Sequence, residues 1–112
     1  MTPVQIEALD YLLDDHYALW DFGDGLPHFR PDANDTKNSE LVTLARRGWV
    51  SVTYGRWERN DTRPCAAEDA VQALEKVANW APTDGKPGFV LELSDSGYRL
   101  LRSMGIGETK SE

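Results

Sequence analysis

The segment NSELVTLARRGWVSVTYGRW, residues 38–57, decides the expected fold because a helical pattern in it changes directly into a strand pattern. Its first half has apolar residues at helical spacing, namely Leu41, Leu44 and Ala45. Gly48 then supplies the left-handed residue that commonly ends a helix. Residues 50–55, VSVTYG, alternate in a way that is typical of a strand with one buried face. The segment therefore predicts a short helix followed at once by a strand.

A second segment, GFVLELSDSGYRLLRSM at residues 88–104, predicts the reverse order, a strand and then a helix. Phe89, Leu91 and Leu93 alternate with the residues between them, and Ser94 or Asp95 can cap the helix that follows. The residues expected to face inward from that helix are Tyr98, Leu101 and Met104.

These two segments resemble parts of MarR-like winged-helix regulators. Residues 38–57 are similar to the recognition helix and first wing strand, and residues 88–104 to the returning wing strand and closing helix. The resemblance implies an α+β, winged-helix-like fold with three to four helices and a small antiparallel sheet. We expect one domain over residues 1–104 and a flexible C-terminal tail over 105–112. A fold of this kind does not fix a function.

The N-terminal third predicts one helix and then less regular structure. Thr2 and Gln5 form a capping-box pattern around Pro3, ahead of an apolar stripe at Ile6, Leu9, Leu12 and Leu13. Residues 17–22, YALWDF, favour a short strand, and the glycines, prolines and aspartates of residues 23–35 favour a loop. Thr36 or Asn38 is expected to cap the next helix.

The chain departs from the winged-helix pattern in two places. The helix that should precede the recognition helix is either missing or reduced to a remnant within residues 27–32. A helix predicted over residues 66–80 is inserted between the two wing strands, with an apolar face at Val71, Leu74, Val77 and Ala78. This insert either covers the sheet or presents Val71, Leu74 and Trp80 to a partner.

Charge is distributed unevenly along this acidic chain of 112 residues, whose net charge is −7. Residues 37–63 hold six bases and three acids, and they form the net-basic third. No apolar run is long enough to span a bilayer, and the N-terminus lacks the basic start of a secretory signal, so we expect a cytoplasmic protein without membrane contact. Cys65 is the single cysteine and has no partner for an internal disulfide.

No residue pattern indicates catalysis, a cofactor or a metal site. Asp14, Asp15 and His16 are adjacent, with Asp21, Asp24 and His28 nearby, but the spacing matches no zinc or EF-hand pattern. A solvated acidic turn explains them. The phosphate-binding and nucleophile-elbow motifs are absent from the sequence. We expect a protein that is not an enzyme.

Two functions remain open. The first is a DNA-binding transcriptional regulator that contacts double-stranded DNA as a homodimer, joined through the inserted helix or the first helix. Its expected DNA-contacting residues are Lys37, Ser39, Thr43, Arg46, Arg47, Arg56, Arg59 and Arg63.

The second is a protein–protein interaction module, such as an adaptor, a phage or mobile-element accessory protein or an inhibitor, on a winged-helix scaffold that has lost DNA binding. Its expected partner-binding residues are Trp57, Val71, Leu74 and Trp80. Trp57 either joins a surface patch with its arginine neighbours or packs under the inserted helix, whereas Trp20 and Trp49 are expected in the core.

Overall fold

The computed structural model describes residues 1–56 and 60–105, which contain five α-helices, two 3-10 helices and four strands. The elements in chain order are α1 (Pro3–Asp14), β1 (Tyr17–Ala18), α2 (Leu19–Gly25), η1 (Pro27–Phe29), α3 (Asn38–Arg46), β2 (Val50–Gly55), β3 (Arg63–Pro64), α4 (Ala67–Glu75), η3 (Val77–Trp80), β4 (Gly88–Leu93) and α5 (Asp95–Ser103). The α+β class is confirmed, with five helices where three to four were expected. None of these helices is long and apolar enough to cross a membrane.

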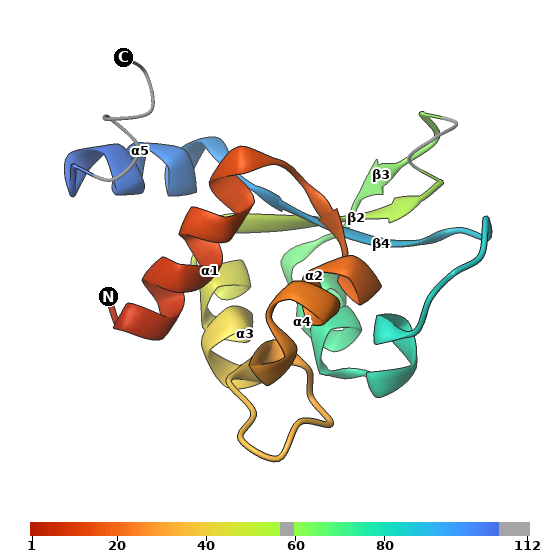
Figure 1. The fold of residues 1–112 in the computed structure, drawn as a ribbon. Helices are drawn as coiled ribbons and strands as arrows, with labels where there is room; N and C mark the ends of the chain where they lie inside the picture. Colours follow the sequence, from red (N-terminus) through yellow and green to blue (C-terminus); the bar gives the residue numbers. More distant parts are fainter. Residues whose placement is uncertain (57–59, 106–112) are drawn as a thin grey trace.

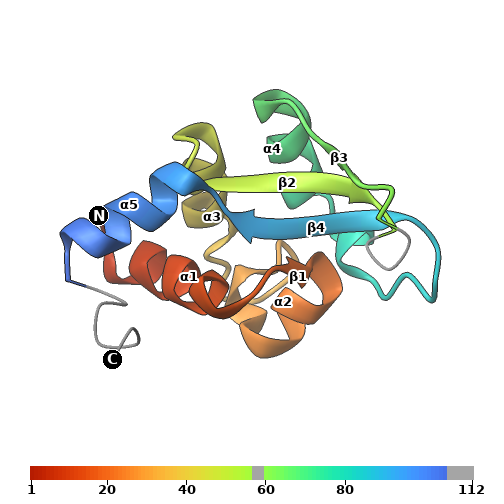
Figure 2. The same ribbon diagram turned by 90° about the horizontal axis from the view of Figure 1, so that it is seen from above.

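The four strands form one antiparallel sheet in the order β1-β4-β2-β3. The longest ladder joins β2 to β4, from Val50 opposite Leu93 to Gly55 opposite Gly88. Helices α2, α3 and α4 lie on one side of this sheet, and α5 continues from the end of β4 (Figures 1 and 2). The returning strand is therefore paired with the strand after α3, and β1 adds to its other edge.

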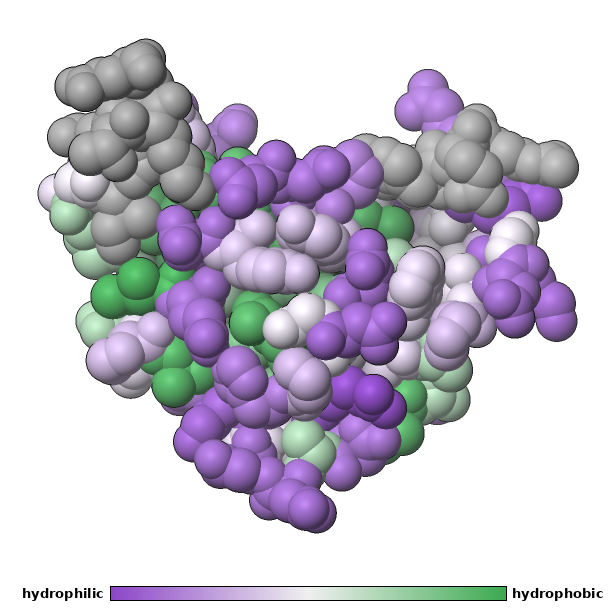
Figure 3. All heavy atoms as spheres, in the orientation of Figure 1, coloured by the Kyte–Doolittle hydropathy of each residue, from purple (hydrophilic) through white to green (hydrophobic). Residues whose placement is uncertain are grey.

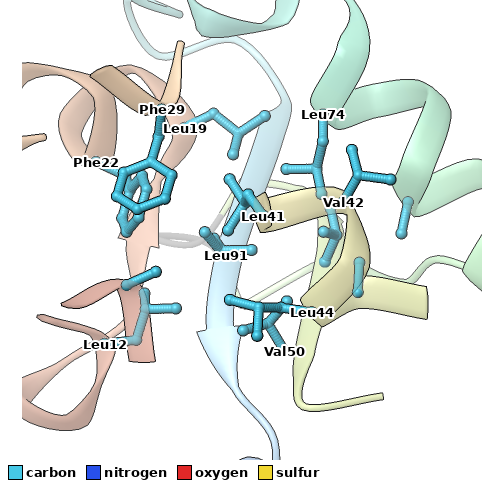
Figure 4. Packing of buried hydrophobic residues seen from close by; sticks show 14 of the residues in the cluster. Leu12, Leu19, Phe22, Phe29, Leu41, Val42, Leu44, Val50, Leu74 and Leu91 are labelled. Carbon is cyan, nitrogen blue, oxygen red and sulfur yellow. The ribbon is translucent and has the colours of Figure 1, made fainter. Parts of the chain in front are cut away.

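Helix α3 is buried on two sides, and five of its nine residues are buried. Leu41 and Leu44 point toward Leu91 of β4, whereas Val42 points toward Leu74 of α4 (Figure 4). Leu41, Leu44, Leu74 and Leu91 have no exposed surface. Since each buried leucine contributes about 1.5–3 kcal/mol, α3 is a central element of the core rather than a helix laid on the surface.

The helix caps follow the sequence closely. The Thr2 hydroxyl accepts from the Gln5 N–H and the Gln5 side chain accepts from the Thr2 N–H, as the capping box predicts. The Ser94 hydroxyl accepts from the Gly97 N–H, and Gly48 has a φ of +76° after α3. At α3 the Thr36 hydroxyl accepts from the Asn38 N–H at 3.1 Å. Asn38 itself is buried and is not a surface cap.

The region predicted as a strand and a loop contains a helix instead. Only Tyr17 and Ala18 form a strand, and α2 occupies residues 19–25, followed by η1. Gly23 and Gly25, which suggested a loop, are sites of close packing within α2. A β-carbon on Gly23 would lie 2.9 Å from Arg30 Cγ, and one on Gly25 would lie 2.1 Å from the Tyr11 hydroxyl. Tertiary packing therefore overrides the low helix propensity of glycine here.

The inserted helix is shorter than predicted, because the α-helical part ends at Glu75 and η3 follows. Val77 is 49% exposed and Ala78 is also exposed, so neither belongs to the buried face. The buried face consists of Ala70, Val71, Ala73 and Leu74. The insert packs mainly against α3 and less extensively against β2, so its buried face forms part of the core.

Several expected core positions lie nearer the surface. Trp20 is on α2 rather than on a strand, and both Trp20 and Trp49 are half-buried. Of the three residues expected to face inward from α5, Leu101 is buried, whereas Tyr98 is 45% and Met104 is 40% exposed. The side of the molecule that carries α1 and α2 is largely hydrophilic, with small separate apolar areas (Figure 3). Apart from Gly105, the expected tail lies outside the described residues.

Candidate functional site: an acidic groove beside α3

The exposed side of α3 is a narrow stripe, because its neighbours cover the rest. Ser39 and Arg46 are exposed and Thr43 is half-buried. The Thr43 hydroxyl donates to the Ser39 carbonyl oxygen at 3.0 Å, within the helix. Glu40, near the start of the helix, accepts from the Thr2 hydroxyl at 2.5 Å. Three of the residues expected to contact DNA are therefore on one side of α3, and the Thr43 hydroxyl among them already donates within the helix.

Buried hydrogen bonds fix α4 against α3. The Asn38 Nδ2 donates to the Leu74 carbonyl oxygen at 2.8 Å and to the Phe29 carbonyl oxygen at 3.2 Å. The Trp80 Nε1 also donates to the Leu74 carbonyl oxygen, at 3.0 Å. The last carbonyl groups of a helix lack helical partners, so these side chains satisfy them and set where α4 ends. The position of α4 relative to α3 is thus determined by directional contacts as well as by packing.

A groove with acidic character runs along α4 beside the end of α3, and we name it the acidic groove. It has a volume of about 530 Å³ and is lined by Arg46, Ala67, Glu68, Val71, Gln72 and Glu75. Glu68, Gln72 and Glu75 are exposed and follow helical spacing, so they form one stripe. Among the described residues no ion pair joins Arg46 to either glutamate. Within the described parts of the chain neither Glu68 nor Glu75 forms an ion pair, so the groove presents two carboxylates beside one guanidinium.

The basic residues expected to bind DNA do not gather on one surface. Arg46 and Arg47 precede β2, whereas Arg56 and Arg63 lie at its far end, roughly 20 Å away at about 3.3 Å per residue. Lys37 pairs with Asp35, with 3.3 Å between Nζ and Oδ1.

Two of these arginines are also engaged locally. The Arg47 guanidinium lies over the Trp49 ring, 5.3 Å from its centroid. The Arg56 N–H donates to Asp61 Oδ1 at 2.6 Å, and its side chain lies 3.4 Å from Asp61 Oδ2. Arg59 and Trp57, also expected at functional surfaces, lie outside the described residues.

The other residues expected to bind a partner are in the core. Leu74 has no exposed surface, Trp80 is 3% exposed and Val71 is 6% exposed. Val71 reaches the floor of the acidic groove, but Leu74 and Trp80 hold α4 in place. The prediction that these side chains face a partner is therefore wrong for Leu74 and Trp80, because the core needs their apolar surface.

Two further titratable side chains, His28 and Cys65, have defined surroundings. His28 Nε2 lies 2.6 Å from Glu7 Oε1, which ties η1 to α1. Burial raises the pKa of the Cys65 thiol, and Asp69 adds to the effect, so the reactive thiolate is disfavoured. Within residues 1–56 and 60–105 no group of three or more metal-ligating side chains is suited to hold a metal ion.

Sequence reasoning missed the residues that define this groove. The sequence does contain a signal for the groove, since three polar residues of the inserted helix follow helical spacing, namely Glu68, Gln72 and Glu75. The net positive charge of residues 37–63 favoured the arginines as site residues instead. Asn38 gave no signal of its buried role, because asparagine before an apolar helix is also typical of a cap.

Comparison with protein-family models, with curated proteins and with solved structures gave no match. The fold and the groove define the chain as a small α+β protein with an acidic groove between two packed helices. Its function has to be inferred from the chemistry of that groove.

Proposed function

We propose that this protein is a non-catalytic protein–protein interaction module that binds a basic segment of another protein in the acidic groove. The observation that carries the proposal is a pair of exposed carboxylates, Glu68 and Glu75, which form no ion pair with the residues that the structure describes and lie on the helix that flanks the exposed side of α3. Carboxylates placed there repel nucleic-acid phosphates and attract lysine or arginine side chains. The net charge of −7 favours encounter with a basic partner as well.

A winged-helix-like scaffold for this module is supported by the order of elements. A helix, a short strand and two helices precede β2, and β4 returns to pair with both β2 and β1. In this scaffold α3 would occupy the recognition position. The insertion of β3, α4 and η3 between β2 and β4 supplies the acidic wall beside it. The insertion thus explains how a DNA-reading scaffold would acquire a protein-binding surface.

DNA binding is the second candidate function, and the exposed Arg46 and Arg47 at the end of α3 favour it. Contacts of this kind would be mainly to phosphates, and they predict binding that falls steeply with salt. We rank it second because Lys37 and Arg56 already pair with aspartates and because Glu68 and Glu75 lie beside Arg46.

The test is fluorescence anisotropy of a labelled lysine- and arginine-rich peptide titrated with the protein. The double substitution Glu68→Gln with Glu75→Gln should weaken binding roughly tenfold, since each exposed ion pair contributes about 0.2–1 kcal/mol. The matched control is Asp21→Asn with Asp24→Asn, which removes the same charge from exposed positions of α2 outside the groove. If the two double variants weaken peptide binding equally, the peptide is attracted only by the net charge of the protein. That result would overturn the proposal.

A further inference from the structure

A second hollow lies at the end of the sheet opposite α5, and we name it the sheet-end hollow. Its volume is about 540 Å³, within the range of about 300–1,000 Å³ that is typical of small-molecule sites. Its lining comes from the end of β1, the start of α2, the end of β2, the start of β4 and the connection before β4. The side chains that give it chemical character are Trp20, Arg56, Asp84, Lys86 and Phe89.

Aromatic side chains form its apolar lining. Trp20 is half-buried, yet it is not among the residues that make up or pack against the described core cluster. Phe89 is also half-buried, and its ring packs against Tyr54 with 4.9 Å between centroids. Trp20 therefore presents a flat aromatic surface in the sheet-end hollow, against which a planar ligand can pack.

Charged groups of both signs line the same hollow. In the described part of the chain neither Asp84 nor Lys86 takes part in an ion pair, although they are two residues apart. Arg56, which also lines the hollow, is paired with Asp61. The hollow therefore holds a carboxylate and an ammonium group that are not neutralised by each other.

The turn that carries these charges has a defined shape. Asp84 and Gly85 have φ values of +51° and +83°, and the Lys86 N–H donates to the Thr83 carbonyl oxygen at 3.0 Å. This is the pattern of a type I′ turn. A β-carbon on Gly88 would lie 2.5 Å from Thr83 Cγ2, so glycine allows the turn to pack closely against the start of β4. The charged side chains are thus presented by an ordered turn.

We propose that the sheet-end hollow binds a small aromatic zwitterion, of which an aromatic amino acid is the simplest example. The aromatic ring packs against Trp20 and Phe89. Lys86 binds the carboxylate, and Asp84 binds the ammonium group. This site is separate from the acidic groove and does not depend on the function proposed for it.

The experiment is an amide NMR titration of the ¹⁵N-labelled protein with three ligands that share one ring. L-phenylalanine carries both charges, 3-phenylpropionate lacks the ammonium group, and phenethylamine lacks the carboxylate. We expect saturable shifts at Gly55, Gly85 and Gly88, with a dissociation constant of about 0.1–1 mM for L-phenylalanine. Each of the other two ligands should bind roughly tenfold more weakly.

Variants assign the contacts separately. Asp84→Asn keeps a residue that tolerates positive φ, and it should weaken phenylalanine and phenethylamine but leave 3-phenylpropionate unchanged. Lys86→Gln should weaken phenylalanine and 3-phenylpropionate and leave phenethylamine unchanged. Trp20→Leu should weaken all three, and the control Lys76→Gln, which lies outside the hollow, should weaken none. No saturation up to roughly 10 mM, shifts that map elsewhere, or equal affinity for the three ligands would overturn the proposal.

Discussion

The acidic groove and the sheet-end hollow have similar volumes, about 530 and 540 Å³, but they are built in different ways. The groove is formed by two helices that are joined by core packing and buried hydrogen bonds. The hollow is closed by a surface turn next to the ends of two strands. The shape of the groove is therefore coupled to the stability of the whole fold, whereas the shape of the hollow depends on local backbone conformation.

The largest loss of stability is expected from Leu74→Asp, because this substitution places a carboxylate at the contact between α3 and α4. Leu74 is fully buried, and the loss of its packing together with an unpaired buried charge should cost more than about 4 kcal/mol. Thermal and urea unfolding would measure the loss, with Leu74→Met as a control that should cost less than about 1.5 kcal/mol. A folded Leu74→Asp monomer of near-native stability would show that α4 is not part of the core.

A smaller effect is expected from Asn38→Ala, which removes the donor that joins α3, η1 and α4. The Phe29 carbonyl loses its hydrogen bond from Asn38, and Leu74 keeps the one from Trp80. We expect a loss of about 1–3 kcal/mol in the free energy of unfolding, together with weaker peptide binding in the groove. Ser39→Ala, its exposed neighbour, should change stability by less than about 0.5 kcal/mol. Equal effects of the two substitutions would contradict the role given to Asn38.

The hollow is expected to respond to a change that leaves the groove intact. Gly85→Ala places a β-carbon at a φ of +83°, which should cost about 1–2 kcal/mol and disturb the turn. Gly85→Asn should cost less because asparagine tolerates this conformation. Amide NMR spectra should change around residues 82–88 and stay unchanged at Arg46 and Glu68. Changes at the groove would show that the two sites are coupled.

The smallest effect concerns pH and Cys65, which follows β3 and precedes α4. Burial and then Asp69 raise the pKa of its thiol in the folded state. The neutral thiol therefore stabilises the fold fully below the unfolded pKa of about 8.5, and this contribution is lost as pH rises through the folded value. Stability measured from pH 7 to 10 should fall less steeply in Cys65→Ser than in the wild type. Identical slopes would contradict this prediction.

Local patterns in the sequence were sufficient for α1, α3, β2, β4 and α5, because periodicity and caps act over a few residues. The capping box at Thr2 and the left-handed Gly48 were both confirmed. Helix α2 was missed because Gly23 and Gly25 suggest a loop, whereas in the structure they allow close contact with Arg30 and Tyr11. Contacts between residues distant in sequence carry no local signal.

The candidate site was predicted less well than the fold, for a related reason. The charge balance of residues 37–63 suggested one basic surface, but β2 separates its arginines and aspartates pair with two of the cations. The acidic stripe, within residues 68–75 of α4, is far from α3 in sequence, because α3 spans Asn38–Arg46. Only the docking of α4 brings that stripe beside Arg46.

Whether the surface beside α3 binds a basic protein segment rather than DNA is tested most directly by fluorescence anisotropy of a labelled mixed-sequence DNA duplex. Binding is measured at low and near-physiological salt, and the solution mass of the protein is recorded alongside. We expect no saturable duplex binding at near-physiological salt under conditions in which the basic peptide binds. Duplex binding that falls steeply with salt and is abolished by Arg46→Ala with Arg47→Ala would contradict it, and α3 would then be a DNA-contacting helix.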